Sequence, residues 1–247
     1  MNQVTESCGL DYDAGSMPPD IPLTLTREYL LDDAAREQLR ALDPEMNIMP
    51  AEAREASIAN LMAQRKQRDG VWVFAYGSLI WNPLFHYAER RVGKIHGYHR
   101  RFCLWTKLGR GTPDNPGLTL GLDRGGSCRG VVYRIAEEAM ASELNLIWRR
   151  EMFTNAYDPQ WVKVVTAEGQ VDAVAFVINR DYPRYARVEE DRVVETIATA
   201  KGRMGDCATY LFNTVDHLEQ LGIRDPILAR IRDRVRERQR ARPVEAS

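Results

Sequence analysis

The amino-acid sequence predicts an α+β fold, a small mixed β-barrel with helices around it. Several segments of β-strand character lie between residues 71 and 178, and helical patterns follow them toward the C-terminal end. No internal repeat is visible, and 247 residues are enough to bury a sizeable core. These observations favour one main domain of mixed structure over a repeat protein.

The N-terminal part differs in character from the rest. Residues 1–22 contain Gly, Ser and Pro without apolar periodicity, which predicts a mobile tail. Residues 23–69 predict a helical N-terminal extension, in two pieces broken near Asp43-Pro44 and Met49-Pro50. Pro50 suits the first turn of the second piece, where its missing N–H is not needed. The main domain is expected to span residues 70–240.

The strands of the main domain begin with Val71–Ala75, a short apolar run that predicts a buried strand. Arg124-Gly125-Gly126-Ser127 is a turn signal between two strand segments, so a hairpin is expected there. A second hairpin is expected to turn at Glu168-Gly169. The expected strands, in chain order, are 71–75, 91–109 (one or two strands), 118–122, 130–135, 161–166 and 171–178.

The helices expected in the main domain are one over residues 137–152 and three near the C-terminal end. The first of these three runs from about Val188 to Gly202, and the second from about Asp206 to Gly222, each ending at glycine. The third starts at Asp225-Pro226, an N-cap followed by proline. Its alternating arginines, from Arg230 to Arg242, are open to two interpretations, a patch for nucleic acid or an acidic partner, or a solvated helix that frays into a tail. The alternation spreads them around the helix, which favours the solvated helix.

Composition argues against several functional classes. The formal net charge of -1 gives no global attraction for nucleic acid, and no apolar stretch is long enough to cross a membrane. No secretory signal is recognisable at the N-terminus, and the four cysteines form no CxxC pair, so a cytoplasmic protein without disulfides is expected. His96 and His99 lack further ligands at metal spacing, so no metal site is predicted.

Glu151 occupies an unexpected position in the helix over residues 137–152. The apolar side chains recur at helical spacing and define a buried face, made of Met140, Leu144, Ile147 and Trp148. Eleven residues after Met140, the helix has returned to within about 20° of the same direction, so Glu151 lies on this face, whereas Arg149 points the opposite way. A carboxylate there is costly unless it is paired or used. The pattern leaves open a salt bridge, a helix end in solvent or a catalytic role.

The turn after the first strand is a second candidate site. Gly77 allows a ligand to approach the backbone closely, and successive N–H groups in Tyr76–Leu79 are suited to bind a carboxylate or an oxyanion. An ordinary strand-to-loop turn explains the same residues. Ser78 is not in a G-x-S-x-G elbow, and Gly109-Arg110-Gly111-Thr112 fits neither a P-loop nor a dinucleotide motif.

Two strings together resemble a known family. Residues 72–83, WVFAYGSLIWNP, resemble the N-terminal signature of ChaC-type γ-glutamylcyclotransferases, and residues 148–152, WRREM, resemble the motif that carries the family's catalytic glutamate. One departure is Ala75, where the family usually has glycine. The resemblance covers residues 70–225 and is closest to bacterial members with a helical N-terminal extension. Further matches in the family's order are Arg100–Cys103, Gly109–Thr112, Gly130–Arg134 and Thr209–Phe212.

The resemblance implies a γ-glutamylcyclotransferase-like fold and a lyase of glutathione catabolism, which converts glutathione to 5-oxoproline and cysteinylglycine without a cofactor. It implies that Glu151 accepts a proton. The γ-glutamyl group would be cradled by Val73, Phe74, Ala75, Tyr76, Gly77, Ser78 and Leu79.

Arg101 and Tyr210 are further candidates for lining the pocket, with surface charge and core packing as their alternative roles. Two other functions remain open, a cyclotransferase for other γ-glutamyl compounds and a non-catalytic regulator of cation transport. The motifs do not predict an oligomeric state.

Overall fold

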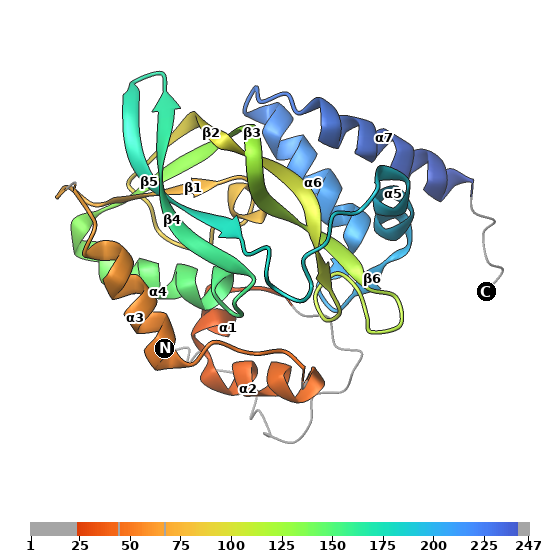
Figure 1. Cartoon of the computed structure of the whole chain (residues 1–247), viewed down its shortest axis with the longest axis horizontal. Coiled ribbons are helices and arrows are strands. Elements are labelled where there is room, and N and C mark those ends of the chain that lie inside the picture. Colours follow the sequence, from red (N-terminus) through yellow and green to blue (C-terminus); the bar gives the residue numbers. More distant parts are fainter. Residues whose placement is uncertain (1–23, 44, 67, 242–247) are drawn as a thin grey trace, which may run out of the picture.

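The computed structural model describes residues 24–43, 45–66 and 68–241, so the predicted mobile tail over residues 1–22 lies outside the described residues. Figure 1 shows a central barrel with helices on several sides. The barrel strands are β1 (Val71–Ala75), β2 (Glu89–Thr106), β3 (Gly117–Ile135), β4 (Tyr157–Thr166) and β5 (Gly169–Ile178). The helices are α1 (Arg27–Leu31), α2 (Asp33–Leu42), α3 (Ala51–Met62), α4 (Met140–Glu151), α5 (Glu190–Thr199), α6 (Cys207–Gln220) and α7 (Pro226–Arg240).

The five strands close into a barrel in the order β1-β3-β2-β4-β5, which confirms the predicted mixed barrel. The barrel is mixed because β1 pairs antiparallel with β3 but parallel with β5, through Trp72↔Ala173 and Val73↔Val174. Every residue of β1 is buried, as the apolar run predicts. The turn after β1 therefore starts from a strand held on both sides.

The hairpin predicted at Arg124–Ser127 is wrong, because β3 runs through these residues as one strand. Gly125 and Gly126 have φ angles of 103° and 70°, and the β2–β3 register shifts between His96 and Tyr98 opposite them. The two glycines thus form a bulge that bends the strand without reversing it. The hairpin joins β2 to β3 through residues 107–116, and the second predicted hairpin, β4–β5, is confirmed.

The C-terminal helices mostly follow the prediction. Helix α6 ends just before Gly222, whose φ is 68°, and α7 begins after Asp225, whose carboxylate accepts a hydrogen bond from the N–H of Leu228 at 3.1 Å. The predicted end of α5 at Gly202 is wrong, because α5 ends at Thr199 and Gly202 lies in the short strand β6 (Lys201–Gly202). This strand pairs with β7 (Gly205–Asp206).

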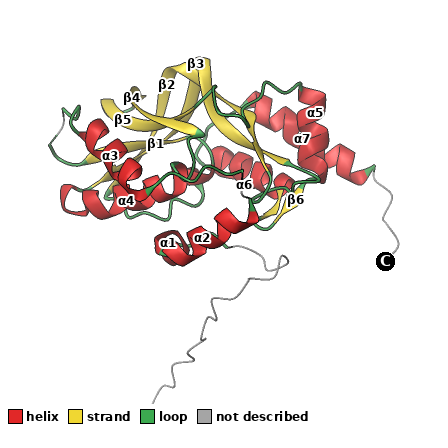
Figure 2. Cartoon of the chain, turned by 60° about the horizontal axis from the view of Figure 1, so that its bottom comes forward, coloured by secondary structure: helices red, strands yellow, loops and turns green. Residues whose placement is uncertain are grey.

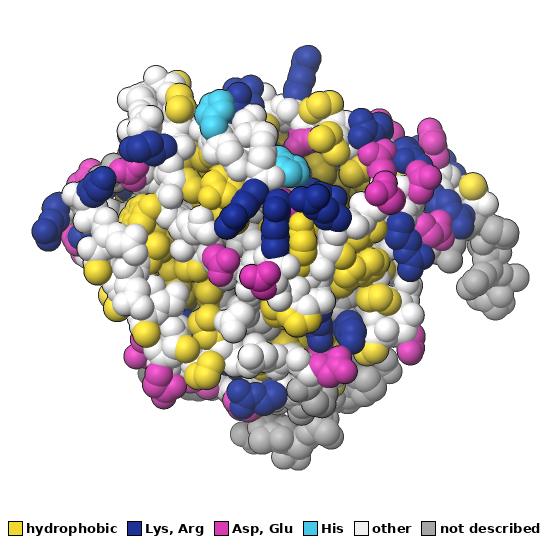
Figure 3. All heavy atoms as spheres, in the orientation of Figure 1, with side chains coloured by type: hydrophobic (Ala, Val, Ile, Leu, Met, Phe, Trp, Pro, Cys, Tyr) yellow, Lys and Arg dark blue, Asp and Glu magenta, His cyan; other side chains and the backbone are white. Residues whose placement is uncertain are grey.

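The arginines of α7 pair with acidic residues of neighbouring helices. Arg230 and Arg234 contact Glu190 at 2.6 and 3.0 Å and lower the pKa of its carboxyl to about 2, chiefly through hydrogen bonds to Arg230. Arg238 contacts Glu195 at 2.6 Å. Figure 3 shows basic and acidic side chains interleaved on the side where α5 and α7 lie. These ion pairs support the interpretation of α7 as a solvated helix.

The N-terminal extension contains three helices where two were predicted, because Asp32 ends α1 and caps α2. Pro50 is the N-cap of α3 and precedes its first turn. Figure 2 shows α1 and α2 on the outside of the barrel, near α4. Arg27 of α1 holds Glu143 of α4 through two hydrogen bonds of 2.6 and 2.8 Å. None of the described helices has the length and apolarity required to cross a membrane.

Candidate active site

Helix α4 carries Glu151 to the inside of the molecule. Leu144, Ile147 and Trp148 are at most 1% exposed, and the Trp148 ring packs edge-on against Phe176 of the barrel at 5.1 Å. Glu151 is the last residue of α4, and its side chain is 14% exposed. The predicted apolar face is therefore present, and Glu151 continues it at the end of the helix.

Arg150 joins Glu151 to the turn after β1. Its side chain is 7% exposed and its Nε lies 3.1 Å from Oε1 of Glu151. The same guanidinium donates to Oγ of Ser78 at 2.9 Å and to the carbonyl oxygen of Asn82. The sequence argument missed Arg150, although a cation beside a glutamate on a buried face was a usable signal. A salt bridge was one of the roles that the sequence allowed for Glu151, and the structure contains it, formed with the adjacent residue Arg150.

Burial raises the pKa of the Glu151 carboxyl, and the Arg150 cation offsets only part of this increase. Three tyrosines lie in the same electrostatic environment, Tyr76, Tyr157 and Tyr210, and burial raises the pKa of each while the Glu151 carboxylate raises it further. These phenols therefore stay neutral and can donate hydrogen bonds beside the carboxylate. Tyr157, which the sequence argument did not identify, belongs to this group.

Each tyrosine hydroxyl of this group is oriented by the barrel backbone. The hydroxyl of Tyr76 donates to the carbonyl oxygen of Phe176 at 2.9 Å, and that of Tyr157 to the carbonyl oxygen of Leu120 at 3.1 Å. The hydroxyl of Tyr210 accepts from the N–H of Leu120 at 3.4 Å. We call Glu151, Arg150, Tyr76, Tyr157 and Tyr210 the Glu151 cluster. Its members come from α4, β4, α6 and the turn after β1.

The seven residues predicted to cradle a ligand divide into two groups. Val73, Phe74 and Ala75 are 0% exposed inside β1, so they support the site without offering a surface to a ligand. Tyr76–Leu79 form the turn, which leads into a short 3₁₀ helix over Ser78–Ile80. Arg100 fixes this turn by donating to the carbonyl oxygen of Tyr76 at 2.7 Å.

The backbone of this turn has free donors. Within the described ranges, the N–H groups of Gly77, Ser78 and Leu79 donate to no protein acceptor, as is usual where a helix begins. A Cβ atom built on Gly77 would lie 3.2 Å from the hydroxyl of Tyr210, so glycine leaves the turn open beside the cluster. Tyr210, predicted to line the pocket, is thus next to Gly77.

Arg101, also predicted to line the pocket, contacts a different group. Its guanidinium lies 3.8 Å from the carboxylate of Asp123, which is fully buried and also contacts Arg180 at 2.6 Å and Tyr185 at 3.0 Å. Among the residues that the structure describes, Arg101 forms no hydrogen bond or ion pair with the Glu151 cluster. Its cation is already directed to a carboxylate of the protein.

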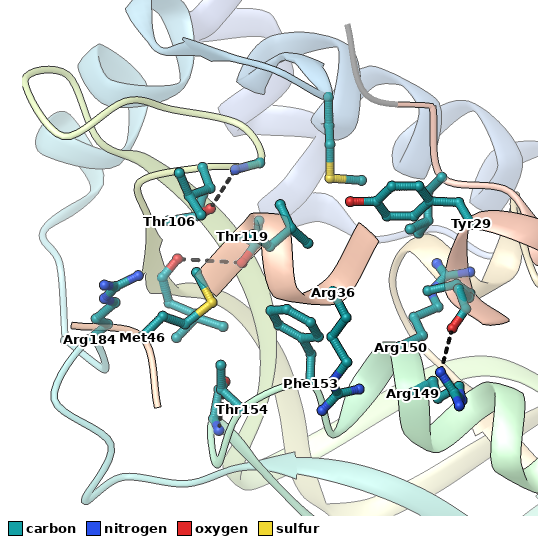
Figure 4. Close-up of a pocket in the computed structure, with 18 of the residues that line it drawn as sticks. Tyr29, Arg36, Met46, Thr106, Thr119, Arg149, Arg150, Phe153, Thr154 and Arg184 are labelled. Carbon is teal, nitrogen blue, oxygen red and sulfur yellow. Dashed lines mark hydrogen bonds between the residues drawn. The ribbon is translucent and has the colours of Figure 1, made fainter. Parts of the chain in front are cut away.

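A cavity of about 290 Å³ adjoins the Glu151 cluster (Figure 4). Glu151 and the turn do not line this cavity, but Arg150 and Phe153 on either side of Glu151 do, as do Thr119 and Ala156, the neighbours of Leu120 and Tyr157. The extension forms its other wall with apolar and cationic side chains, among them Leu25, Tyr29, Leu30, Arg36 and Leu39. The extension thus encloses space beside the candidate site.

The described residues contain no cluster of metal-ligand side chains, and their cysteines form no disulfide. Across residues 24–43, 45–66 and 68–241, no three His, Cys, Asp or Glu side chains gather as a metal site would require. Cys103, Cys128 and Cys207 are buried free thiols, and burial raises the pKa of each.

Comparison with known proteins places this geometry in a class. The fold matches a yeast γ-glutamylcyclotransferase specific to glutathione with a TM-score of 0.64 and 24% identity, over 69% of this chain and 97% of that chain. The sequence model of the ChaC-like protein family matches residues 71–238. The barrel is thus of the γ-glutamylcyclotransferase type, and the chain belongs to the ChaC-like family.

Curated relatives of this chain have specific names. The glutathione-specific gamma-glutamylcyclotransferase of Escherichia coli (strain K12) is 38% identical over 203 residues, covering 81% of this chain and 87% of the relative. The human glutathione-specific gamma-glutamylcyclotransferase 1 is 32% identical, covering 70% and 83%. Gamma-glutamylcyclotransferase 2-3 of Arabidopsis thaliana is 33% identical, covering 67% and 88%. The family membership expected from the sequence motifs is confirmed.

Proposed function

We propose that this chain is a glutathione-specific γ-glutamylcyclotransferase, a lyase that converts glutathione to 5-oxoproline and cysteinylglycine. The observation that carries the proposal is the partly buried Glu151, paired with Arg150 and joined through it to the turn after β1. The names of the bacterial and human relatives support glutathione as the substrate.

The reaction is an internal aminolysis. The α-amino nitrogen of the glutamyl group attacks its own γ-carbonyl carbon, and the bond between that carbon and the cysteine nitrogen breaks. One proton leaves the attacking amine and one reaches the departing amine, so no water is consumed. Because the nucleophile is tethered, holding the chain folded can supply effective molarities of about 10⁵–10⁸ M.

Glu151 is proposed to carry the proton. A free α-amine has a pKa of about 8 and is mostly protonated at neutral pH, so a base must deprotonate it. A carboxyl whose pKa burial has raised is a stronger base than an exposed one, and it can return the proton to the departing amine. A positioned base of this kind contributes about 10²–10⁴ in rate.

The turn after β1 is proposed to stabilise the oxyanion and the α-carboxylate. Its unpaired N–H groups at Gly77, Ser78 and Leu79 are donors fixed by the rigid strand before them. Each such donor to an oxyanion contributes about 10²–10³ in rate. We restrict direct contact to Tyr76–Leu79 and Tyr210, because Val73, Phe74 and Ala75 have no exposed surface.

The cavity beside the cluster is proposed to accept the cysteinylglycine half of the substrate.

We place the boundary between the extension and the catalytic domain at Gly70, and the family match starting at residue 71 supports this choice.

A reducing cytoplasm is the compartment we propose, because the thiols of Cys103, Cys128 and Cys207 are free and glutathione is abundant in its reduced form there.

Incubation of the purified chain with reduced glutathione tests the proposal, with 5-oxoproline and cysteinylglycine measured by mass spectrometry. Stoichiometric formation of both products is expected. Release of glutamate would instead indicate a hydrolase, and no product at all would favour a non-catalytic regulator. A parallel panel of γ-glutamyl amino acids tests the alternative substrate range, since equal kcat/KM for γ-glutamylalanine and glutathione would contradict glutathione specificity.

A further inference from the structure

Arg100 is a buried cation behind the turn after β1. Its side chain is 3% exposed and extends from β2, which β3 separates from β1. All three of its guanidinium nitrogens contact oxygens of the protein. Nη1 donates to the carbonyl oxygen of Tyr76 at 2.7 Å, Nη2 donates to that of Arg129, and Nε lies 2.9 Å from Oδ2 of Asp225. The guanidinium is therefore held in one orientation.

These contacts occur where β1 separates from β3. The ladder between the two strands ends at the pair Ala75↔Val131, and Tyr76 is the first residue beyond it. A Cβ atom built on Gly130 would lie 2.2 Å from the carbonyl oxygen of Ala75, so glycine lets the end of β1 approach β3 closely. Because the ladder has ended, a side-chain donor from β2 takes its place and bridges the carbonyl oxygens of Tyr76 and Arg129.

The carbonyl of Tyr76 belongs to the same peptide group as the N–H of Gly77. A planar trans peptide directs its C=O and its N–H to opposite sides, so the contact with Arg100 also fixes the direction of that N–H, away from the buried guanidinium. Among the described residues, this N–H is one of the donors of the turn that no protein acceptor occupies. A cation on the carbonyl also polarises the peptide group and makes its N–H a stronger donor.

We propose that Arg100 is a positioning residue of the reaction, which aims the N–H of Gly77 at the oxyanion that forms from the γ-carbonyl oxygen. This inference rests on the proposed function. The nitrogens of Arg100 are all engaged by protein oxygens, so it acts through the peptide group and not by contact with the substrate. Arg150 holds the next residue of the same turn, Ser78, at 2.9 Å. The donor is thus in place before the oxyanion develops, which lowers the energy of the transition state.

Steady-state kinetics of Arg100→Gln with glutathione test the inference, together with urea unfolding of each variant. The oxyanion exists only in the transition state, so kcat is expected to fall about 10- to 100-fold while KM stays within about threefold of the wild-type value. The loss should not exceed that of deleting an oxyanion donor, because the N–H of Gly77 remains but is no longer aimed. Arg100→Lys, which keeps the charge and can donate to one carbonyl, should recover part of kcat.

Asp225→Asn separates the positioning role from a structural one. Asparagine caps a helix as well as aspartate does, so α7 keeps its start and Arg100 keeps the carbonyl of Tyr76, but the ion pair is lost. This variant should lose stability in urea and keep its kcat. Arg134→Gln is the matched control, because Arg134 also donates to a backbone carbonyl, that of Asp69 at 3.2 Å, before the other end of β1. It should keep its kcat as well.

Wild-type kcat in folded Arg100→Gln would overturn the inference. A higher KM with unchanged kcat would also overturn it, because the contact would then serve substrate binding. An equal loss of kcat in Asp225→Asn would assign the effect to the packing of α7 and overturn it too. If Arg100→Gln does not fold, wild-type kcat in Arg100→Lys overturns the inference instead. Failure of the unsubstituted enzyme to release 5-oxoproline would overturn the proposed function, and this inference with it.

Discussion

Arg150 and Glu151, neighbours in sequence, form an ion pair of 3.1 Å at the end of α4, and the same guanidinium holds Ser78 at 2.9 Å. One side chain therefore fixes both the proposed base and the proposed oxyanion-binding turn. Because the Arg150 cation lowers the pKa of Glu151 against the larger effect of burial, it also influences the pH at which the base is ionised.

Replacing Arg150 with Gln is expected to shift the pH dependence of kcat. The base must be ionised, so activity rises as pH increases through the pKa of Glu151. Loss of the cation raises that pKa further, and the acidic limb of the profile should move to higher pH. Arg150→Lys, which keeps the charge, should shift it less. Superimposable profiles of wild type and Arg150→Gln would show that Arg150 does not tune the base.

Replacing Glu151 with Gln keeps the shape and removes the base. We expect kcat to fall at least about 10²-fold while KM stays close to that of the wild type. Glu138→Gln, at an exposed position just before α4, is the control and should retain full activity. Circular dichroism should be native for both. Normal turnover by Glu151→Gln would assign the proton transfer to another group.

Replacing Gly77 with Val is expected to abolish substrate binding while the fold remains. The Cβ atom would stand 3.2 Å from the Tyr210 hydroxyl, and the two methyl groups would fill the space beside the free N–H donors. Isothermal titration with glutathione, carried out in the Glu151→Gln background to prevent turnover, measures the affinity. Wild-type affinity in the Gly77→Val protein would move the γ-glutamyl site away from this turn.

Replacing Arg27 with Gln should loosen the N-terminal extension. Burial alone would raise the pKa of Glu143, but hydrogen bonds from Arg27 and from the N–H of His86 outweigh it, so the pKa is lowered. The stability from this pair is therefore present above the unfolded-state pKa of about 4.3 and is lost as pH falls through the folded-state pKa.

At neutral pH we expect Arg27→Gln to lower the free energy of unfolding by about 1–3 kcal/mol, and the difference from wild type should shrink in acid below about pH 4. Urea unfolding at both pH values measures it. Arg40→Gln is the control, since its pair with Glu37 is exposed and should contribute less than about 0.5 kcal/mol. An equal effect of Arg27→Gln at both pH values would show that its contact with Glu143 is not the cause.

Local sequence signals predicted local structure well. The apolar stripe of α4, the buried strand β1 and the Asp225-Pro226 start of α7 follow from side-chain periodicity and capping, which depend on near neighbours in the chain. Glycine signals were less reliable, because a glycine can serve a turn, a bulge or a close contact. At Gly125 and Gly126 the sequence indicated a hairpin turn, but the structure has a bulge. At Gly202 the sequence indicated a helix end, but this glycine instead allows a close contact with Gly109.

The sequence by itself determined the family, the mixed barrel and the position of Glu151 on a buried helix face, because motifs and helical periodicity are properties of contiguous residues. Only the tertiary structure decided which cations surround that glutamate. Arg101, chosen from the sequence, contacts Asp123, whereas Arg150, whose role the sequence argument missed, contacts Glu151 and reaches Ser78 of a distant segment at 2.9 Å. The physical reason is that a charge finds its partner through space, after strands and helices from distant segments have packed together.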